Sequence, residues 1–162
     1  MALILYQRKN LVLHASACSK NKNVILFSGR SGSGKSTILQ EACKKGYKFI
    51  TEDVSAIQIY GNNTKVLPSF PLIKLEQKNL SEDLISRKIL DVDKDRRNRE
   101  LFQLKNNYIE KEKLSPTSCY FFSGKGDFDI ETINNPIEKV KTVYKNIWRQ
   151  VPYDSCKESE KI

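Results

Sequence analysis

The sequence has few of the residues that build metal centres and membrane spans. It contains a single histidine, which excludes a histidine-based metal cluster. Its cysteines Cys18, Cys43, Cys119 and Cys156 form no C-x-x-C pair, so a structural zinc site is not predicted and free thiols are the expected state. The longest apolar runs, such as residues 11–13, are far too short to cross a lipid bilayer. We therefore expect no membrane partner.

A secretory signal is also lacking. Residues 1–9 read MALILYQRK, so the basic residues follow the apolar ones, which is the reverse of the order in a signal peptide. We therefore expect a cytoplasmic protein. The chain has 162 residues, of which 39% are hydrophobic and 29% charged, and this suffices for one globular domain with a real core. We place that domain at residues 1–153 and a charged tail at residues 154–162.

Acidic residues are outnumbered, and the net charge of +9 suits anionic partners. The basic residues are spread along the chain, with a local concentration at Lys94, Arg96, Arg97 and Arg99. Because no basic stripe interleaved with aromatic residues is present, the sequence gives no specific support for nucleic-acid binding. A solvated basic surface explains the charge equally well.

The most informative segment that is present is residues 29–36, which read GRSGSGKS and match the phosphate-loop motif G-x-x-x-x-G-K-[ST]. An apolar, strand-like run at residues 24–27 precedes it, and a helix-like segment at residues 36–43 follows. In such a loop, glycines let successive backbone N–H groups surround phosphate oxygens, and the next helix adds its positive N-terminal end.

The motif also assigns chemistry to side chains. Lys35 can reach the β- and γ-phosphates, and the Ser36 hydroxyl can hold Mg²⁺. We therefore predict that the chain binds a nucleoside triphosphate together with Mg²⁺, and the motif leaves ATP, GTP or a polyphosphate open as the phosphate donor. The predicted nucleotide-binding residues are Gly29, Ser31, Gly32, Ser33, Gly34, Lys35, Ser36 and Thr37.

The remaining pattern predicts a mixed α/β fold around this loop. Gly46, after two lysines, is expected to end the helix that follows the loop, and Asn79 or Ser81 to begin another helix that runs through Leu90. Residues 91–99 and 105–117 are expected to be an exposed loop and a mobile polar segment. Strands are expected at residues 2–6, 11–17, 23–28, 47–50, 54–60, 64–67, 100–104, 118–122 and 128–133.

The last helix has the clearest signals. Asn135 is a capping residue, Pro136 occupies the first turn, where no N–H is needed, and Glu138 suits the positive helix end. Apolar residues then recur at helical spacing, which favours a stripe that faces the core. The stripe consists of Ile137, Val140, Tyr144, Ile147, Trp148 and Val151.

Asp53 is the best acidic candidate for phosphoryl-transfer chemistry. It ends a predicted strand 18 positions after Lys35, which is one helix and one strand later. Because the ends of parallel strands share one edge of a sheet, Asp53 can bind Mg²⁺ through water or accept a proton from a hydroxyl group. The neighbouring Glu52 would point the opposite way if the pair is extended. A plain acidic turn is the alternative interpretation.

His14 lies in the apolar run LVLHASA at residues 11–17. Taken alone, this position favours a buried, hydrogen-bonded histidine of the core.

Three segments together are similar to the catalytic domain of HPr kinase/phosphorylase. They are LHASA at residues 13–17, the phosphate loop, and KGYKFITED at residues 45–53. The chain also resembles, more closely, the short HPr-kinase-like proteins of lasso-peptide gene clusters. In this family a histidine precedes the loop lysine by about 21 residues and an acidic pair ends 18 residues after it, as His14, Lys35 and Asp53 do here. PSFPLIKL at residues 68–75 and CYFF at residues 119–122 extend the similarity.

The resemblance implies a fold and a set of roles. It implies a mixed, phosphoenolpyruvate-carboxykinase-like sheet and ATP-dependent phosphorylation of a serine in a peptide or protein, such as a lasso precursor peptide. Lys35 would hold the phosphates, Ser36 and Asp53 the metal, and Asp53 would also take the proton of the serine. His14 would lie close to the reacting phosphate, which reverses its interpretation as a core residue. Arg96 or Arg97 would be a phosphate clamp, with a solvated loop as the alternative, and homo-oligomers are common in the family.

Two departures from the family keep other functions open. Glu52 stands where the family usually has aspartate, and the glycine-rich E-I-R-G-type segment, which supplies another metal ligand, is not found. A nucleotide-binding sensor or scaffold without transfer chemistry is therefore one alternative. A small-molecule kinase, with residues 91–113 as its lid, is the other.

Overall fold

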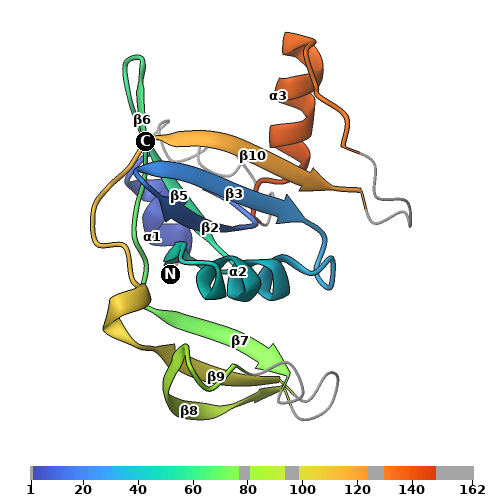
Figure 1. The fold of residues 1–162 in the computed structure, drawn as a ribbon. Coiled ribbons are helices and arrows are strands. Elements are labelled where there is room, and N and C mark those ends of the chain that lie inside the picture. The colour runs from blue at the N-terminus through green and yellow to red at the C-terminus, as the bar shows by residue number, and fades with distance from the viewer. Residues whose placement is uncertain (1, 77–80, 94–98, 124–129, 149–162) are drawn as a thin grey trace, which may run out of the picture.

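The computed structural model describes residues 2–76, 81–93, 99–123 and 130–148. Over these residues the fold is mixed α/β, with strands in three small sheets and few helices (Figure 1). The described part holds no helix that is both long and apolar enough to span a bilayer. The predicted tail at residues 154–162 lies outside the described residues.

The central sheet has four strands in the order β10-β3-β2-β4. These strands are β10 (Pro116–Phe122), β3 (Asn23–Gly29), β2 (Ala15–Lys20) and β4 (Lys48–Thr51). β10 runs parallel to β3, whereas β2 runs antiparallel to both β3 and β4. Consequently β3, β4 and β10 all end at the same edge of the sheet, and β2 begins there.

The helix after the phosphate motif covers one side of this sheet. α2 (Lys35–Lys44) buries Leu39 and Cys43 against Phe27 and Phe49 of the sheet. Gly46 follows with a positive φ of 83°, which glycine adopts without strain and which ends the helix as the sequence predicted. The strand–loop–helix order at residues 23–44 is therefore confirmed.

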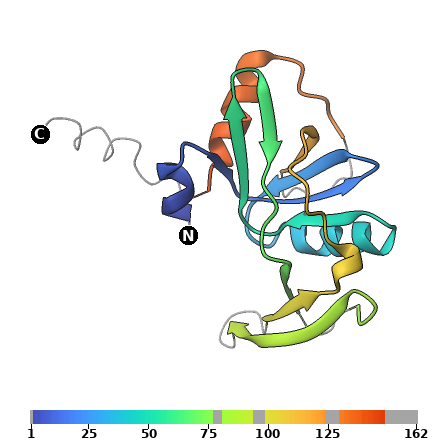
Figure 2. The same ribbon diagram turned by 90° about the vertical axis from the view of Figure 1, so that its left-hand side faces the viewer.

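Two further sheets flank this unit (Figures 1 and 2). One has the order β1-β5-β6, with β1 (Leu11–Leu13), β5 (Ser55–Tyr60) and β6 (Asn63–Val66). The other has the order β7-β9-β8, with β7 (Leu72–Glu76), β9 (Arg99–Leu104) and β8 (Ile85–Asp93). This third sheet packs Ile73, Leu75, Phe102 and Leu104 into the same core as α2.

Some predicted elements were wrong. Residues 2–7 form a helix, α1 (Ala2–Gln7), and not a strand, because a short apolar run fits either structure and Ala and Leu favour helix. The predicted strand at 11–17 is interrupted at His14, which separates β1 from β2.

The predicted helix ending at Leu90 was also wrong, since β8 extends along β9 as its antiparallel partner. β8 continues to Asp93 and β9 begins at Arg99, so both ends of the predicted loop at 91–99 are strand, while residues 94–98 lie outside the described part. Residues 105–117 contain the 3₁₀ helix η2 (Asn106–Tyr108) and a buried Leu114. Residues 130–133 form no strand, and 128–129 are not described.

The C-terminal helix α3 (Pro136–Lys145) begins as predicted. The Asn135 side chain accepts hydrogen bonds from the backbone N–H groups of Ile137 and Glu138 at 2.9 and 3.3 Å. The predicted burial of its apolar stripe is wrong for Ile137, Val140 and Tyr144, which are more than 60% exposed. Ile147, just after the helix, does pack against a core cluster, and Val151 lies outside the described residues. Periodicity shows which residues share a face but not whether that face is covered. In Figure 1, α3 stands at the upper right, at the periphery of the molecule.

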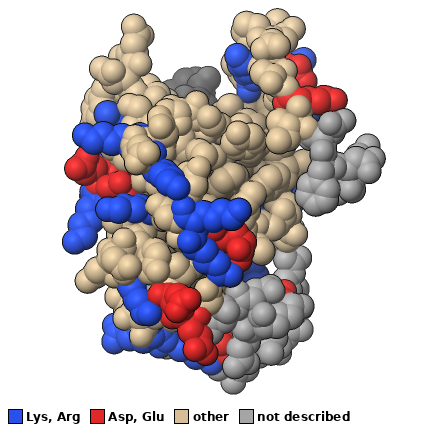
Figure 3. Space-filling model, viewed as in Figure 1, with Lys and Arg blue, Asp and Glu red and all other residues tan. Residues whose placement is uncertain are grey.

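Basic side chains do not form one continuous patch on the face shown in Figure 3. They lie along the left side, at the centre and in the lower part of this face, and a few lie at the upper right, with acidic side chains among them. This distribution fits a solvated basic surface.

Candidate functional site

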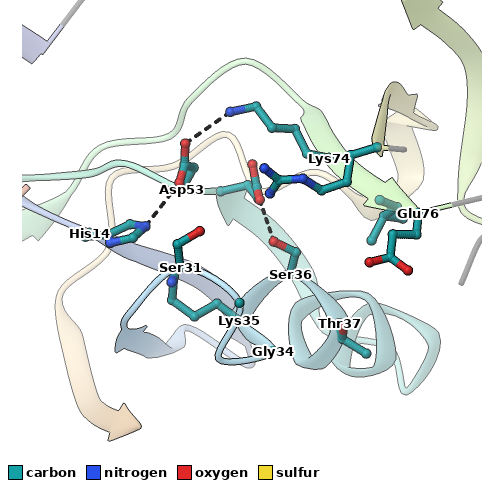
Figure 4. Close-up of a pocket in the computed structure, with 13 residues that line it drawn as sticks. His14, Ser31, Gly34, Lys35, Ser36, Thr37, Asp53, Lys74 and Glu76 are labelled. Carbon is teal, nitrogen blue, oxygen red and sulfur yellow. Dashed lines mark hydrogen bonds and ion pairs between the residues drawn. The ribbon is translucent and has the colours of Figure 1, made fainter. Parts of the chain in front are cut away.

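A cavity of about 330 Å³ opens at the edge of the central sheet where β3 and β4 end and β2 begins (Figure 4). The motif loop, the turn after β4, and β7 of the third sheet all contribute side chains to it. Its lining consists of His14, Ser31, Gly32, Gly34, Lys35, Ser36, Thr37, Glu52, Asp53, Lys74, Leu75, Glu76 and Arg99.

Two glycines shape the motif loop. Gly34 caps the N-terminus of α2 with φ 88° and ψ 8°, a left-handed backbone conformation that residues other than glycine rarely adopt. Gly29 lies so close to β10 that a Cβ atom there would approach the Phe122 Cβ to 3.0 Å. The loop therefore turns sharply from β3 into α2 and directs the helix N-terminus at the cavity.

Lys35 is buried beneath the loop. Its Nζ donates hydrogen bonds to the carbonyl oxygens of Gly29 at 2.8 Å and Arg30 at 2.9 Å. Burial lowers the pKa of this amine, and the charges of Asp53 and Glu52 partly oppose the shift. The amine is thus held at the base of the loop with two carboxylates close enough to influence it.

Ser36 faces the first residue of the acidic pair. Its hydroxyl donates to Glu52 Oε1 at 2.5 Å. Burial is the main influence on Glu52 and raises the pKa of its carboxyl to about 7; the hydrogen bond from Ser36 opposes this shift and the charge of Asp53 adds to it.

Both carboxylates of the pair reach the cavity because the chain is not extended there. Asp53 has a φ of 68°, and the Val54 N–H donates to the Glu52 carbonyl at 2.8 Å, which makes a tight turn after β4. In an extended chain the two side chains would point to opposite sides. The condition under which Glu52 would point away, an extended pair, is therefore not met, and the left-handed conformation of Asp53 is the physical reason.

Asp53 is engaged at both oxygens. His14 Nε2 lies 3.2 Å from Oδ1, and Lys74 Nζ donates to Oδ2 at 3.1 Å (Figure 4). The hydrogen bond from His14 is the largest influence and lowers the pKa of the carboxyl well below its usual range; burial opposes it, and the charge of Lys74 adds to it. Asp53 is therefore held ionised and oriented.

His14 is fixed through its backbone. Its N–H donates to the Asn146 carbonyl, after α3, at 2.9 Å, and its carbonyl accepts from the Ser28 hydroxyl at 3.0 Å. The imidazole is about one quarter exposed, so it is not the enclosed core histidine that its apolar run suggested. The break between β1 and β2 turns it toward Asp53.

Sequence reasoning missed the contribution of the third sheet. Lys74 and Glu76 are two residues apart on β7, so their side chains lie on the same face of the strand. Glu76 pairs with Arg99 of β9 in the register of the two strands. The sequence did hold a signal, because Lys74 lies in the segment at residues 68–75 that extends the family resemblance. The distance along the chain does not, however, predict that β7 lies next to the motif loop. Of the predicted nucleotide-binding residues, Gly29 and Ser33 do not line the cavity. Arg96 and Arg97, the predicted clamp, lie outside the described residues.

The chemistry of the donor set fits Mg²⁺. The described residues contain no group of three or more His, Cys, Asp or Glu side chains that could hold a metal ion by themselves. Mg²⁺, however, is commonly bound by one or two carboxylates together with substrate phosphates and water. The Ser36 hydroxyl and the Glu52 carboxylate supply adjacent oxygen atoms of this kind.

Comparison with known proteins identifies no family. No protein-family model matches the chain, and no curated protein matches it significantly. Among solved structures, the Hpr(Ser) kinase/phosphatase from Coxiella burnetii is similar to part of it, with 23% sequence identity and a TM-score of 0.35. The similarity covers 38% of this chain, and the chain spans 43% of the length of that protein. A likeness of this extent says nothing about activity.

Proposed function

We propose that this chain is an ATP-dependent kinase that transfers the γ-phosphoryl group to a serine hydroxyl of a peptide or protein. The observation that carries the proposal is the convergence, in one cavity, of Lys35 and the motif loop with Asp53 and its partner His14. A phosphate-binding loop alone indicates only a bound phosphate. A fixed, ionised carboxylate beside it supplies the residue that phosphoryl transfer needs to orient and deprotonate an acceptor.

Each residue has a role in this proposal. The loop N–H groups and Lys35 bind the β- and γ-phosphates, and the N-terminus of α2 adds positive potential. Mg²⁺, held by Ser36 and Glu52 with the phosphates, would neutralise charge on the phosphate oxygens. The sequence-based assignment of Asp53 as a metal ligand stays a prediction. Asp53 accepts the proton of the serine hydroxyl while His14 holds its other oxygen.

A nucleotide-binding sensor without transfer chemistry is the second candidate. It is favoured by one observation: both oxygens of Asp53 are already engaged, one by His14 and one by Lys74. A carboxylate whose two oxygens each have a protein partner has no oxygen reserved for an acceptor hydroxyl. The two candidates differ in whether bound ATP is ever consumed.

The test is transfer of labelled phosphate. We expect the full chain, with γ-labelled ATP and Mg²⁺, to add one phosphate to a serine in peptides encoded by neighbouring genes or in a serine-containing peptide library, read by mass spectrometry. Lys35→Ala should abolish both transfer and nucleotide binding, because it removes the amine that reaches the phosphates. Asp53→Asn should abolish transfer and retain much of the nucleotide binding.

Asparagine is the suitable replacement at residue 53, because it tolerates the left-handed φ of 68° better than alanine does. The control is Lys44→Ala, which removes an exposed lysine of the same helix, away from the cavity lining. Full transfer activity in Asp53→Asn contradicts the assignment of the base. Tight ATP binding with no phosphorylated product from any peptide favours the sensor.

A further inference from the structure

Lys74 belongs to the third sheet and reaches the motif-loop cavity from the opposite side. It lies on β7, two residues before Glu76, and its Nζ is 3.1 Å from Asp53 Oδ2 (Figure 4). The same cavity is lined by Ser31, Gly32 and Gly34 of the loop. One cation therefore faces both the proposed base and the space next to the proposed phosphate cradle.

The ion pair presents a chemical conflict. A carboxylate that accepts a proton from a hydroxyl needs an oxygen directed at that hydroxyl. His14 engages Oδ1 and Lys74 engages Oδ2. Of the two partners, the lysine can move more easily, because its flexible four-carbon stem carries rotatable donors, whereas the backbone of His14 is fixed on both sides.

A terminal phosphoryl group is a stronger attractor for this amine than the carboxylate. It carries more negative charge and more acceptor oxygens, and lysine binds phosphate as a point charge. The Lys74 and Asp53 side chains are 32% and 38% exposed, so their ion pair is partly screened by water and contributes little to stability. Moving the Lys74 amine from Asp53 to a phosphoryl group therefore costs little free energy.

We propose that Lys74 leaves Asp53 for the γ-phosphoryl group of a bound nucleoside triphosphate, and that this exchange frees Asp53 Oδ2 for the acceptor hydroxyl; the inference rests on the proposed function. The hydroxyl proton then passes to Oδ2, and the hydroxyl oxygen forms a bond to the γ-phosphorus. The bond from the γ-phosphorus to the β–γ bridging oxygen breaks, and the diphosphate leaves with the electron pair. A diphosphate has no γ-phosphoryl group, so with it bound Lys74 stays on Asp53.

Nucleotide affinities test this without knowledge of the acceptor. Dissociation constants of the full chain for ADP and for a non-hydrolysable ATP analogue, both with Mg²⁺, are measured by titration calorimetry. We expect Lys74→Met to weaken binding of the triphosphate about 10-fold or more and of ADP less than about twofold, since only the triphosphate offers the charge-assisted contact. Lys74→Arg should retain the preference for the triphosphate.

The matched control is Lys88→Met. Lys88 lies on β8 of the same sheet and is also paired with a carboxylate, Glu100 at 2.5 Å, but it does not line the cavity. It should leave both affinities unchanged. An unchanged ratio of triphosphate to diphosphate affinity in Lys74→Met overturns the role of Lys74 alone. Absence of binding of either nucleotide to the unsubstituted chain overturns the proposed function and this inference with it.

A second measurement uses the unsubstituted chain and does not depend on the folding of a variant. Acetylation of lysines by a water-soluble active ester is followed by peptide mass spectrometry. The triphosphate analogue should slow acetylation of Lys74 about fivefold or more relative to ADP, because the amine becomes enclosed between phosphate and protein. Equal acetylation rates with the two nucleotides contradict the exchange.

Discussion

At the scale of single residues, one backbone conformation determines the character of the candidate site. Asp53 is in the left-handed region with φ 68°, so the acidic pair folds over and directs both carboxylates into one cavity. A non-glycine residue there carries some strain, although aspartate tolerates it better than most. The pKa values of the two carboxyls nevertheless differ, because burial is the main influence on that of Glu52 and the hydrogen bond from His14 is the main influence on that of Asp53. Two adjacent carboxyls thus acquire opposite pKa shifts.

The shift of Glu52 predicts a pH-dependent stability. In the folded chain its pKa is raised to about 7 from the usual 4.5, so the folded state keeps a proton that the unfolded chain releases. This contribution is fully present below pH 4.5 and is lost as pH rises through 7. Glu52→Gln removes the titration, and we expect it to raise the free energy of unfolding by about 3 kcal/mol at pH 8 relative to its effect at pH 4.

Urea unfolding between pH 4 and 8, with a chelator present, measures this difference. Glu41→Gln, whose side chain is half exposed on α2, controls for the loss of one negative charge. If the difference in free energy of unfolding between Glu52→Gln and the unsubstituted chain does not change with pH, the raised pKa of Glu52 is contradicted.

At the scale of elements, the sequence correctly predicted those structures that depend on residues close together in the chain. The strand–loop–helix unit at residues 23–44 and the cap of α3 follow from glycine, asparagine and proline chemistry within a few positions. The sequence predicted the strand at residues 100–104 but not the third sheet to which it belongs, because β7 and β8 pair with β9 through contacts that no local pattern encodes. For the same reason Lys74 was missed while His14, Lys35 and Asp53 were selected. Their arrangement around one cavity required the order of the strands.

Helix α3 offers a test at this scale. Its cap residue Asn135 accepts two backbone N–H groups, and Asn135→Ala leaves both without that partner. Loss of such a cap costs about 1 kcal/mol. Because α3 is mostly exposed, we expect the loss to appear as local opening, with amide hydrogen exchange in residues 137–145 roughly fivefold faster.

Amides of β2 and β3 should exchange as before, which makes them an internal control. Equal acceleration throughout the chain would show that α3 opens only together with the whole fold.

At the scale of the whole molecule, two apolar clusters hold the sheets together. One joins α2 with the central and third sheets, and the other joins the central sheet to β5, β6 and the end of α3. Cys18 and Cys43 lie in the first cluster with 0% and 1% exposure, and burial raises the pKa of each thiol to about 12. Their reactivity therefore reports on that cluster.

We expect iodoacetamide at pH 8 to leave both thiols unmodified in the native protein, since the thiolate is the reactive species and neither sulfur is accessible. Peptide mass spectrometry should show their modification rising with urea in parallel with global unfolding. Modification of either within minutes under native conditions would contradict the described core.

The parallel pairing of β10 with β3 has a consequence for the order in which the molecule is made. β2 and β3 are joined by a short turn and can pair as soon as both have been synthesised, whereas Val24 must wait for Pro116. Until then the strand that leads into the motif loop has one open edge, and Gly29 lacks the contact with Phe122 that confines it. A nascent chain should therefore acquire a rigid motif loop only after residues 116–122 have been synthesised and β10 has paired with β3.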